Sequence, residues 1–268
     1  TGISITESQI SDLNHFTTAD ETDPSVPPGT QTGEMQYWDG SEWVNVPAGS
    51  SGQILVFVNG KPTWGVQGMV DGDVHNPVTD KVWMDRNLGA SQVATASDDP
   101  DSYGDLYQWG RAADGHESRT SENYDGDANG KPSIYDESGD WDEKFITTNT
   151  SPYDWLDPQD DNLWQGVSGH NNPCPSGYRL PTQAEWEAEI ATWDSEDAAG
   201  AFGSPLKLPV AGRRSFSNGS LGDVGSGGLY WSSTVDVNYS RGLFFDSIDA
   251  LVVSYKRGFG SSVRCIKD

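Results

Sequence analysis

The sequence has few basic side chains, two cysteines and no long apolar run. Its 16 lysine and arginine residues are outnumbered by 41 aspartate and glutamate residues, giving a formal net charge of −25. Nucleic acids and anionic membrane surfaces bind proteins through clustered lysine and arginine. A membrane-spanning helix needs about 20 consecutive apolar residues. We therefore expect no nucleic-acid partner, no binding to an anionic membrane surface and no membrane span.

The two cysteines, Cys174 and Cys265, are too few for a zinc site built from several thiolates. They can form one disulfide, which would close a loop of roughly ninety residues and stabilise the fold by about 4–5 kcal/mol in the chain-entropy model. Two buried free thiols are the alternative.

Glycine (31), tryptophan (11) and tyrosine (10) are abundant in the 268 residues. So many aromatic residues exclude a disordered chain. Together with the glycines they are typical of loop-rich β structure with an aromatic core. The length allows one large domain, or one domain with an appendage.

The chain begins with two segments that cannot form a core by themselves. Residues 1–19 are expected to contain a short helix, because Thr6 and Gln9 have the spacing of a capping box. Residues 20–32 are polar and rich in proline, which predicts an extended linker.

Residues 33–67 contain two similar units, GEMQYWDG followed by Trp43 and GQILVFVNG followed by Trp64. Each unit predicts a β-hairpin, with tight turns at Asp39-Gly40 and Asn59-Gly60. Two isolated hairpins are marginally stable. They are therefore expected to assemble with other copies of the chain or to dock on the main domain.

The N-terminal segment also resembles the stem repeats of phage tail-fibre proteins. The resemblance is carried by the lines ITESQISDL and GQILVFVNGKPTW. It implies a fibre-like stem and a homotrimer formed through that stem.

Regular elements are sparse in residues 68–268. Residues 82–84 predict a short strand, and residues 104–113 predict a helix, since Leu106, Trp109 and Ala113 would share one face. A second helix is predicted after Thr182, which forms a capping box with Glu185 ahead of apolar residues at helical spacing.

Residues 114–172 are rich in Asp, Gly, Ser and Asn and show little periodicity, far beyond the usual loop length of about 4–6 residues. We expect long loops here, held to the core by large aromatic side chains. The candidate anchors are Trp141, Phe145, Tyr153, Trp155 and Trp164.

One acidic part of this region spaces its residues like the calcium loop of an EF-hand. With glycine at the sixth position, the ligand positions are occupied by Asp125, Asp127, Asn129, Lys131, Ser133 and Asp136. Asp136 stands where a bidentate glutamate is usual, Pro132 interrupts the loop, and no helices are predicted on either side. A structural Ca²⁺ and an acidic turn are the two interpretations, and no cofactor is required.

Several motifs occur in a fixed order over residues 69–268. They are WMDRNLGAS, YQWGRAADGHESRTS, NNPCPSGYRLPTQAEWEAE, LKLPVAGRR, GLYWSST and SVRCIKD. This order resembles the Fibrobacter-type major paralogous domain, whose relatives include the variable proteins of diversity-generating retroelements and the formylglycine-generating-enzyme branch of the C-type-lectin fold.

The resemblance implies an α+β, C-type-lectin-like domain over residues 68–268, with mixed short strands, two helices and long loops, behind a small N-terminal β-hairpin stem. It also implies a disulfide between Cys174 of the NPCP motif and Cys265 of the VRC motif.

In retroelement variable proteins the segment between WSST and SVRC differs widely between members, because template adenines are randomised. The corresponding variable region here is about residues 235–261. The resemblance implies that its variable, ligand-contacting positions are Asp236, Val237, Asn238, Tyr239, Ser240, Gly242, Phe244, Asp246, Ile248, Asp249, Leu251, Val253, Ser254, Tyr255, Phe259 and Ser261.

Strand alternation within this region supports an exposed face. Leu243, Phe245 and Ser247 would point to the core, while the even-numbered residues 242–248 would point to solvent. The alternative is a strand buried on both faces, because residues 251–253 are continuously apolar. Residues 236–240 have a composition favoured in antibody-type binding loops.

These observations predict a hypervariable receptor- or ligand-binding protein, not an enzyme, located extracellularly or on a virion surface as a tail-fibre tip or cell-surface adhesin. Its partner would be a host or partner-cell surface protein or glycan. The alternative is a secreted glycan-binding or adhesion module of the same fold that is not diversified. A formylglycine-generating-type enzyme is disfavoured, because both cysteines occupy the motifs of the structural bridge.

Overall fold

The computed structural model describes residues 32–50, 53–132 and 139–268. The chain divides into two compact units, Thr1–Gln67 and Gly68–Asp268. The helix expected within residues 1–19 and nearly all of the expected linker lie outside the described residues. Within the described ranges, no helix is both long enough and apolar enough to cross a membrane.

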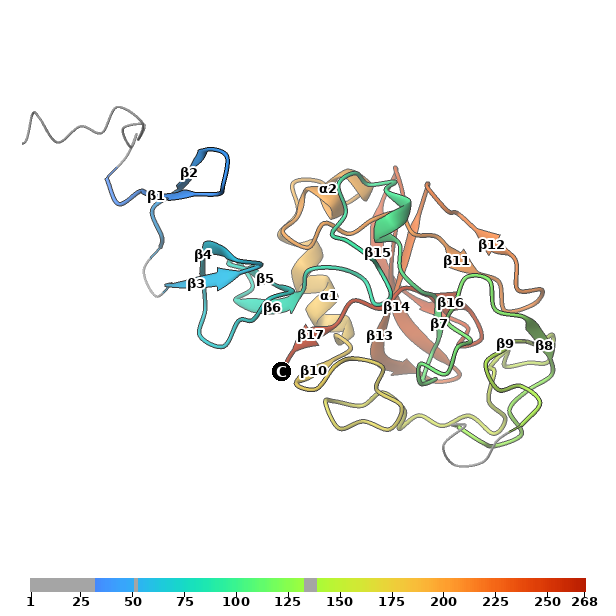
Figure 1. Cartoon of the computed structure of the whole chain (residues 1–268). Helices are drawn as coiled ribbons and strands as arrows, with labels where there is room; N and C mark the ends of the chain where they lie inside the picture. The colour runs from blue at the N-terminus through green and yellow to red at the C-terminus, as the bar shows by residue number, and fades with distance from the viewer. Residues whose placement is uncertain (1–31, 51–52, 133–138) are drawn as a thin grey trace, which may run out of the picture. The chain divides into compact units, whose positions relative to one another are not determined.

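The first unit contains both expected hairpins (Figure 1). Their strands are β1 (Met35–Trp38) with β2 (Trp43–Val46), and β3 (Ile54–Val58) with β4 (Lys61–Gly65). Asn59 and Gly60 have φ values of 51° and 72°, as a two-residue turn with left-handed central residues requires. The first turn is wider than expected, because the Asp39 carboxylate accepts the backbone N–H groups of Ser41 and Glu42 at 2.8 and 2.9 Å.

The second unit is a mixed α+β structure of small, mostly antiparallel sheets with few helices. Its described helices are α1 (Gln183–Ile190), α2 (Ala198–Gly203) and the 3-10 helix η2 (Pro100–Ser102). Its strands are β5 (Asp73–Asn76), β6 (Lys81–Met84), β7 (Tyr107–Gln108), β8 (Asn123–Asp125), β9 (Phe145–Thr147), β10 (Tyr178–Arg179), β11 (Arg213–Arg214), β12 (Leu221–Gly222), β13 (Gly228–Asp236), β14 (Tyr239–Phe245), β15 (Ala250–Tyr255), β16 (Gly260–Ser261) and β17 (Ile266–Lys267).

The sheets tie distant parts of this unit together (Figure 1). One sheet has the order β10-β17-β6-β5, so that Ile266 near the C-terminus pairs with Trp83 near the start of the unit. A second has the order β12-β11-β16-β7, and a third joins β13, β14 and β15. Strands β8 and β9 form a parallel pair. The expected strand at residues 82–84 corresponds to β6.

Helix α1 begins as predicted. The Thr182 hydroxyl accepts the N–H of Glu185 at 3.2 Å, and the Glu185 carboxylate accepts the N–H of Thr182 at 2.8 Å. The three apolar residues at helical spacing, Trp186, Ile190 and Trp193, are all buried, although Trp193 lies beyond the end of α1. This capping box satisfies N–H groups that the first turn leaves without helical partners.

The helix predicted for residues 104–113 is wrong. Gly104 and Gly110 have φ values of 64° and 83°, which end any right-handed helix at these positions. Between them the chain is extended through β7, with Leu106 and Trp109 buried at either side. The Gln108 amide donates to the carbonyls of Ile146 and Gly258 at 2.8 and 2.9 Å. The apolar spacing therefore reflects a strand that is buried on both faces.

Large aromatic residues do anchor the long loop region. Trp141, Phe145, Trp155 and Trp164 are all buried, whereas Tyr153 is half-buried. The indole N–H of Trp155 donates to the carbonyl of Trp109 at 2.6 Å. Burial with a satisfied N–H group explains how a stretch with little regular structure can keep a defined path.

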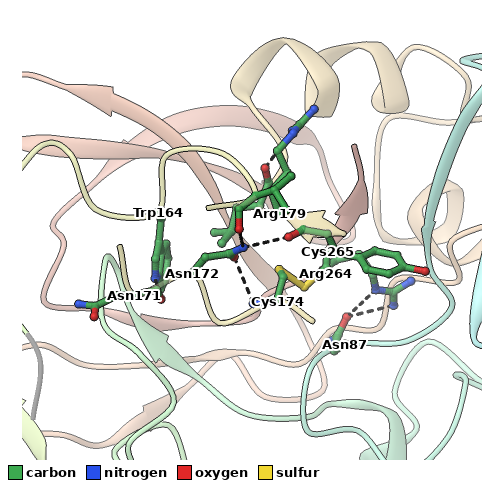
Figure 2. The surroundings of a disulfide bond; sticks show 11 residues. Asn87, Trp164, Asn171, Asn172, Cys174, Arg179, Arg264 and Cys265 are labelled. Atoms are coloured by element: carbon green, nitrogen blue, oxygen red, sulfur yellow. Dashed lines mark hydrogen bonds between the residues drawn. A yellow bond between two sulfur atoms is a disulfide. The ribbon is translucent and has the colours of Figure 1, made fainter. Parts of the chain in front are cut away.

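The bridge between Cys174 and Cys265 is present, with a Cα–Cα distance of 5.9 Å, and Figure 2 shows its surroundings. The alternative of two free thiols is thereby excluded. The Asn172 side chain accepts the N–H of Cys174 at 3.2 Å. On the other side, the buried Arg264 donates twice to the Asn87 side-chain oxygen at 3.0 and 3.1 Å. Hydrogen-bonded polar groups thus hold both chain segments at the bridge.

Candidate ligand-binding face

The predicted variable region forms most of the β13-β14-β15 sheet. Strand β14 pairs with both neighbours, so that Leu243 lies opposite Tyr230 and Val252, and Phe244 lies opposite Leu229 and Leu251. Because side chains alternate along a strand, these rows point to opposite faces of the sheet. The sheet therefore has an inner face, where the Tyr230 ring lies 6.0 Å from that of Trp186 in α1, and an outer face. On the outer face Leu229 and Trp231 of β13 are buried as well, so that only β14 and β15 are accessible there.

The inner face is a packed aromatic layer. Tyr230, Leu243 and Phe245 have no exposed surface. The Phe245 ring lies 5.7 Å from that of Tyr230 and 6.0 Å from that of Trp193. Leu243 and Phe245 are therefore core residues, as predicted. Ser247 is exposed instead, because β14 ends at Phe245 and the chain turns away from the core.

Most predicted ligand-contacting residues are accessible on the outer face or at its turns. Val237 and Ile248 are 78% and 83% exposed, and Tyr239 and Leu251 are 37% and 38% exposed. The other exposed positions are Asn238 and Asp249, and the half-buried ones are Asp236, Phe244, Asp246, Val253, Tyr255 and Phe259. Ser254 is also exposed, but it lies opposite Arg241, in a row that shares the inner face with Leu243. The alternative of a strand buried on both faces is thus wrong for Leu251.

Three of the residues predicted to contact a ligand are buried, so the prediction is wrong for them. Ser240 lies in the middle strand of the sheet with no exposed surface. A Cβ on Gly242 would lie 2.9 Å from the carbonyl oxygen of Tyr230, so no side chain fits there. Ser261 belongs to β16 and pairs with Tyr107 inside the unit. Neither the residue types nor the strand alternation shows which other segments of the chain lie next to these residues.

A cavity of about 390 Å³ opens at one end of the outer face. It is lined by Arg213, Asp223, Ser226, Gly227, Phe244, Asp246, Ser247 and Tyr255. The sequence identified Phe244, Asp246 and Tyr255 as contact residues. It missed the wall formed by residues 213–227, whose only signal was that Arg213 belongs to the LKLPVAGRR motif.

The cavity wall combines an ion pair with a phenol. Arg213 Nη2 lies 3.0 Å from Asp223 Oδ2, and its guanidinium also lies 5.3 Å from the centre of the Phe259 ring. Burial raises the pKa of Tyr255; nearby Asp223 adds to this effect and Arg213 opposes it. The Tyr255 hydroxyl is therefore protonated at neutral pH and can donate a hydrogen bond.

A buried arginine holds the turn between β13 and β14. Arg257 is 1% exposed, lies 4.5 Å from the centre of the Trp109 ring and donates to Asp161 Oδ1 at 2.5 Å. The same Nη2 lies 3.4 Å from the carbonyl oxygens of Val237 and Tyr239. Because these contacts involve only the main chain of the turn, they do not depend on the side chains at positions 237 and 239.

The predicted calcium loop is only partly described. Asp125 lies in β8, and the Asp127 carboxylate accepts the N–H of Asn129 at 2.6 Å. Ser133 and Asp136 lie outside the described residues. The calcium site therefore stays a prediction.

The carboxylates of Asp114 and Glu117 and the His116 ring come within 4.8 Å of one another, close enough to suggest a metal site. However, His116 Nδ1 lies 2.7 Å from Asp114 Oδ1, and its Nε2 accepts the N–H of Gln108 at 3.1 Å. Arg111 also lies 2.8 Å from Asp114 Oδ2. Both ring nitrogens of this fully buried histidine are engaged, so the cluster is a structural network.

Replacing His116 by glutamine is expected to destabilise the protein less at pH 4.5 than at pH 7.5. Burial, assisted by Arg111, lowers the pKa of His116 from 6.5 to about 4, although Asp114 opposes the shift. Between these values the unfolded chain binds more protons, so the stability due to His116 is complete above pH 6.5 and is lost as the pH falls. The pKa shift corresponds to a loss of unfolding free energy on the order of 3 kcal/mol by pH 4.

Urea unfolding of the wild type and His116→Gln at both pH values measures this effect. The difference between the two proteins isolates His116 from other groups that titrate in the same range. A difference that is the same at pH 7.5 and pH 4.5 would contradict the prediction.

Comparison with known proteins finds no matching family model, curated protein or solved structure. The candidate site is therefore defined by the chain's own residues, namely the outer face of β14 and β15, the adjoining turns and the cavity.

Proposed function

We propose that this chain is a receptor- or ligand-binding protein whose second unit is a C-type-lectin-like domain diversified by a retroelement. Its ligand would contact the outer face of β14 and β15 and the adjoining turns. The observation that carries the proposal is the separation within one short segment between buried Leu243 and Phe245 and exposed Val237, Tyr239 and Ile248.

This separation suits a surface whose side chains change while the fold stays constant. Exposed substitutions away from structural contacts usually change stability by at most about 0.5 kcal/mol. The accessible set mixes aromatic and aliphatic side chains with polar ones, which is typical of binding hot spots surrounded by polar groups. The main-chain contacts of Arg257 with residues 237 and 239 support the same conclusion.

Binding without catalysis is the proposed activity. Both cysteines are joined in the bridge, which leaves no free thiol for an oxidase of the formylglycine-generating type. A disulfide is consistent with a secreted or extracellular protein, since such bonds persist in oxidising compartments. We propose a virion tail-fibre tip or a cell-surface adhesin as its setting, and a surface protein or glycan of a host or partner cell as its ligand.

The first unit would assemble the molecule. Trp38 of the first hairpin is 54% exposed, and Ile54, Leu55 and Phe57 of the second are 46%, 39% and 65% exposed. Exposed apolar side chains on small hairpins that are marginally stable by themselves are typical of segments that assemble with a partner. We propose that the first unit joins three copies of the chain.

A library of the full chain randomised at its most accessible face positions is expected to consist mostly of folded proteins. These positions are Val237, Asn238, Tyr239, Ile248 and Asp249. A matched library randomised at Leu243, Phe245 and Tyr230 is expected to lose most folded members, because large-to-small changes at buried sites cost about 2–5 kcal/mol. Protease resistance of displayed proteins measures both. Equal survival of the two libraries would contradict the prediction.

Selection of the first library against a purified surface protein tests binding itself. Selected members should lose binding when the randomised positions revert to the parental residues, whereas a protein of another function would yield no binders. Sequencing of sister copies of the gene separates the two binding hypotheses, because only diversification confines substitutions to the predicted positions. A fixed segment would favour the glycan-binding or adhesion module.

A further inference from the structure

The cavity at the end of the outer face has a net negative lining. Arg213 supplies one positive charge, while Asp223 and Asp246 supply two negative charges. The charges of Arg213 and Asp223 compensate each other, because the two side chains form an ion pair with an N–O distance of 3.0 Å. In the described part of the chain Asp246 has no ion-pair partner. The cavity therefore presents one carboxylate charge to a ligand.

The Asp246 carboxylate is held in position from its own turn. Its Oδ1 accepts the N–H groups of Ile248 and Asp249 at 2.7 and 3.3 Å. Its backbone carbonyl accepts the N–H of Ala198 at 2.7 Å. A carboxylate fixed in this way can bind a cation with little further loss of conformational freedom.

Aromatic side chains form the wall beside this carboxylate. Phe244 and Tyr255 are half-buried, and both line the cavity. An aromatic face near a carboxylate attracts a guanidinium or ammonium group through the ring quadrupole as well as through charge. The same unit already places Lys256 Nζ 3.8 Å from the centre of the Tyr153 ring.

The cavity is large enough to accept a single long side chain. The volume of about 390 Å³ lies at the lower end of the range for ligand pockets, about 300–1,000 Å³. The formal charge of −25 attracts cationic partners over long distances.

We propose that this cavity binds a basic side chain, an arginine or lysine, on the surface of a partner protein. The inference rests on the proposed binding function and names the ligand chemistry of the same face. The cation would contact the carboxylate of Asp246 and the ring of Phe244. Because both positions belong to the predicted variable set, this preference would belong to the present variant and not to the scaffold.

Titration of the ¹⁵N-labelled full chain with Nα-acetyl-arginine amide tests the proposal by NMR. The backbone amides of Ser226, Gly227 and Ser247 are expected to shift with a saturable dependence on concentration. The citrulline analogue has nearly the same shape but no charge, and it should bind at least tenfold more weakly.

Two substitutions with the same change in net charge complete the test. Asp246→Asn retains an oxygen that can accept the turn N–H groups, and it should weaken arginine binding about tenfold. Asp249→Asn alters an exposed neighbour that does not line the cavity, and it should weaken binding less than twofold.

Equal effects of the two variants, or equal binding of arginine and citrulline amides, would overturn the proposal. A neutral oligosaccharide that shifts the same amides when arginine amide does not would also overturn it, in favour of a glycan pocket, while leaving the binding function intact. Failure of the selected libraries despite arginine binding would instead remove the proposed function alone.

Discussion

Removal of the Cys174–Cys265 bond is expected to lower the free energy of unfolding by about 4–5 kcal/mol in the chain-entropy model. The two cysteines are 91 residues apart in sequence, and the enclosed segment contains α1, α2 and the whole β13-β14-β15 sheet. Without the bond, the unfolded chain regains the freedom that closure of this long loop had removed. The loss is a large fraction of the stability of a typical domain, about 5–15 kcal/mol.

The measurement is urea unfolding of the oxidised protein, the reduced protein and the double variant Cys174→Ala/Cys265→Ala. The reduced wild type is the matched control, because it keeps both sulfur atoms, whereas alanine at the buried Cys265 leaves a small cavity. The two bridge-free proteins should agree within about 1 kcal/mol, with the alanine variant the less stable. A reduced wild type that is less than about 1 kcal/mol weaker than the oxidised protein would contradict the prediction.

Local sequence patterns predicted the elements whose cause is local. The capping box of Thr182 and Glu185 and the Asn59-Gly60 turn depend on residues within a few positions of one another, and both are present. The alternation that places Leu243 and Phe245 in the core depends only on the strand period. Such features can be derived without knowledge of the rest of the chain.

Features that depend on distant neighbours could not be derived. Residues 104–113 have helical spacing, yet Gln108 bonds to Ile146 and Gly258 in other segments, and this pairing favours an extended chain. Gly242 lacks space because of the carbonyl of Tyr230 on the next strand. The wall of the cavity was missed for the same reason, since Arg213 and Asp223 reach the variable region only through the folded chain.

Replacement of Arg257 by methionine is expected to cost about 3–5 kcal/mol, as removal of one partner from a buried charge network usually does. Arg257 is 1% exposed and lies 3.9 Å from the carboxylate of Asp154. Burial raises the pKa of Asp154 to about 6, and Arg257 is one of the groups that oppose this rise. Without the guanidinium, the pKa of Asp154 should rise further.

The pH dependence of this variant distinguishes loss of charge from loss of packing. Because the folded-state pKa of Asp154 lies above the unfolded value of 3.8, the folded protein holds the extra proton, and stability is lost as the pH rises through about 6. Arg257→Met should therefore be less destabilised at pH 5 than at pH 8. Arg213→Met, which alters a more exposed pair with Asp223, should cost at most about 1 kcal/mol at either pH.

The same substitution connects the scaffold to the proposed binding face. Arg257 holds the turn between β13 and β14 through the carbonyls of Val237 and Tyr239. Its loss should speed hydrogen exchange at the N–H groups of residues 237–239 while the exchange of Leu243 in the middle of β14 follows global unfolding. Urea unfolding and hydrogen exchange together measure both effects. Unchanged hydrogen exchange at the turn, or a stability loss below about 1 kcal/mol, would show that the turn keeps its conformation without Arg257. The contacts of Arg257 with the main chain would then not explain how the variable side chains are held at the surface.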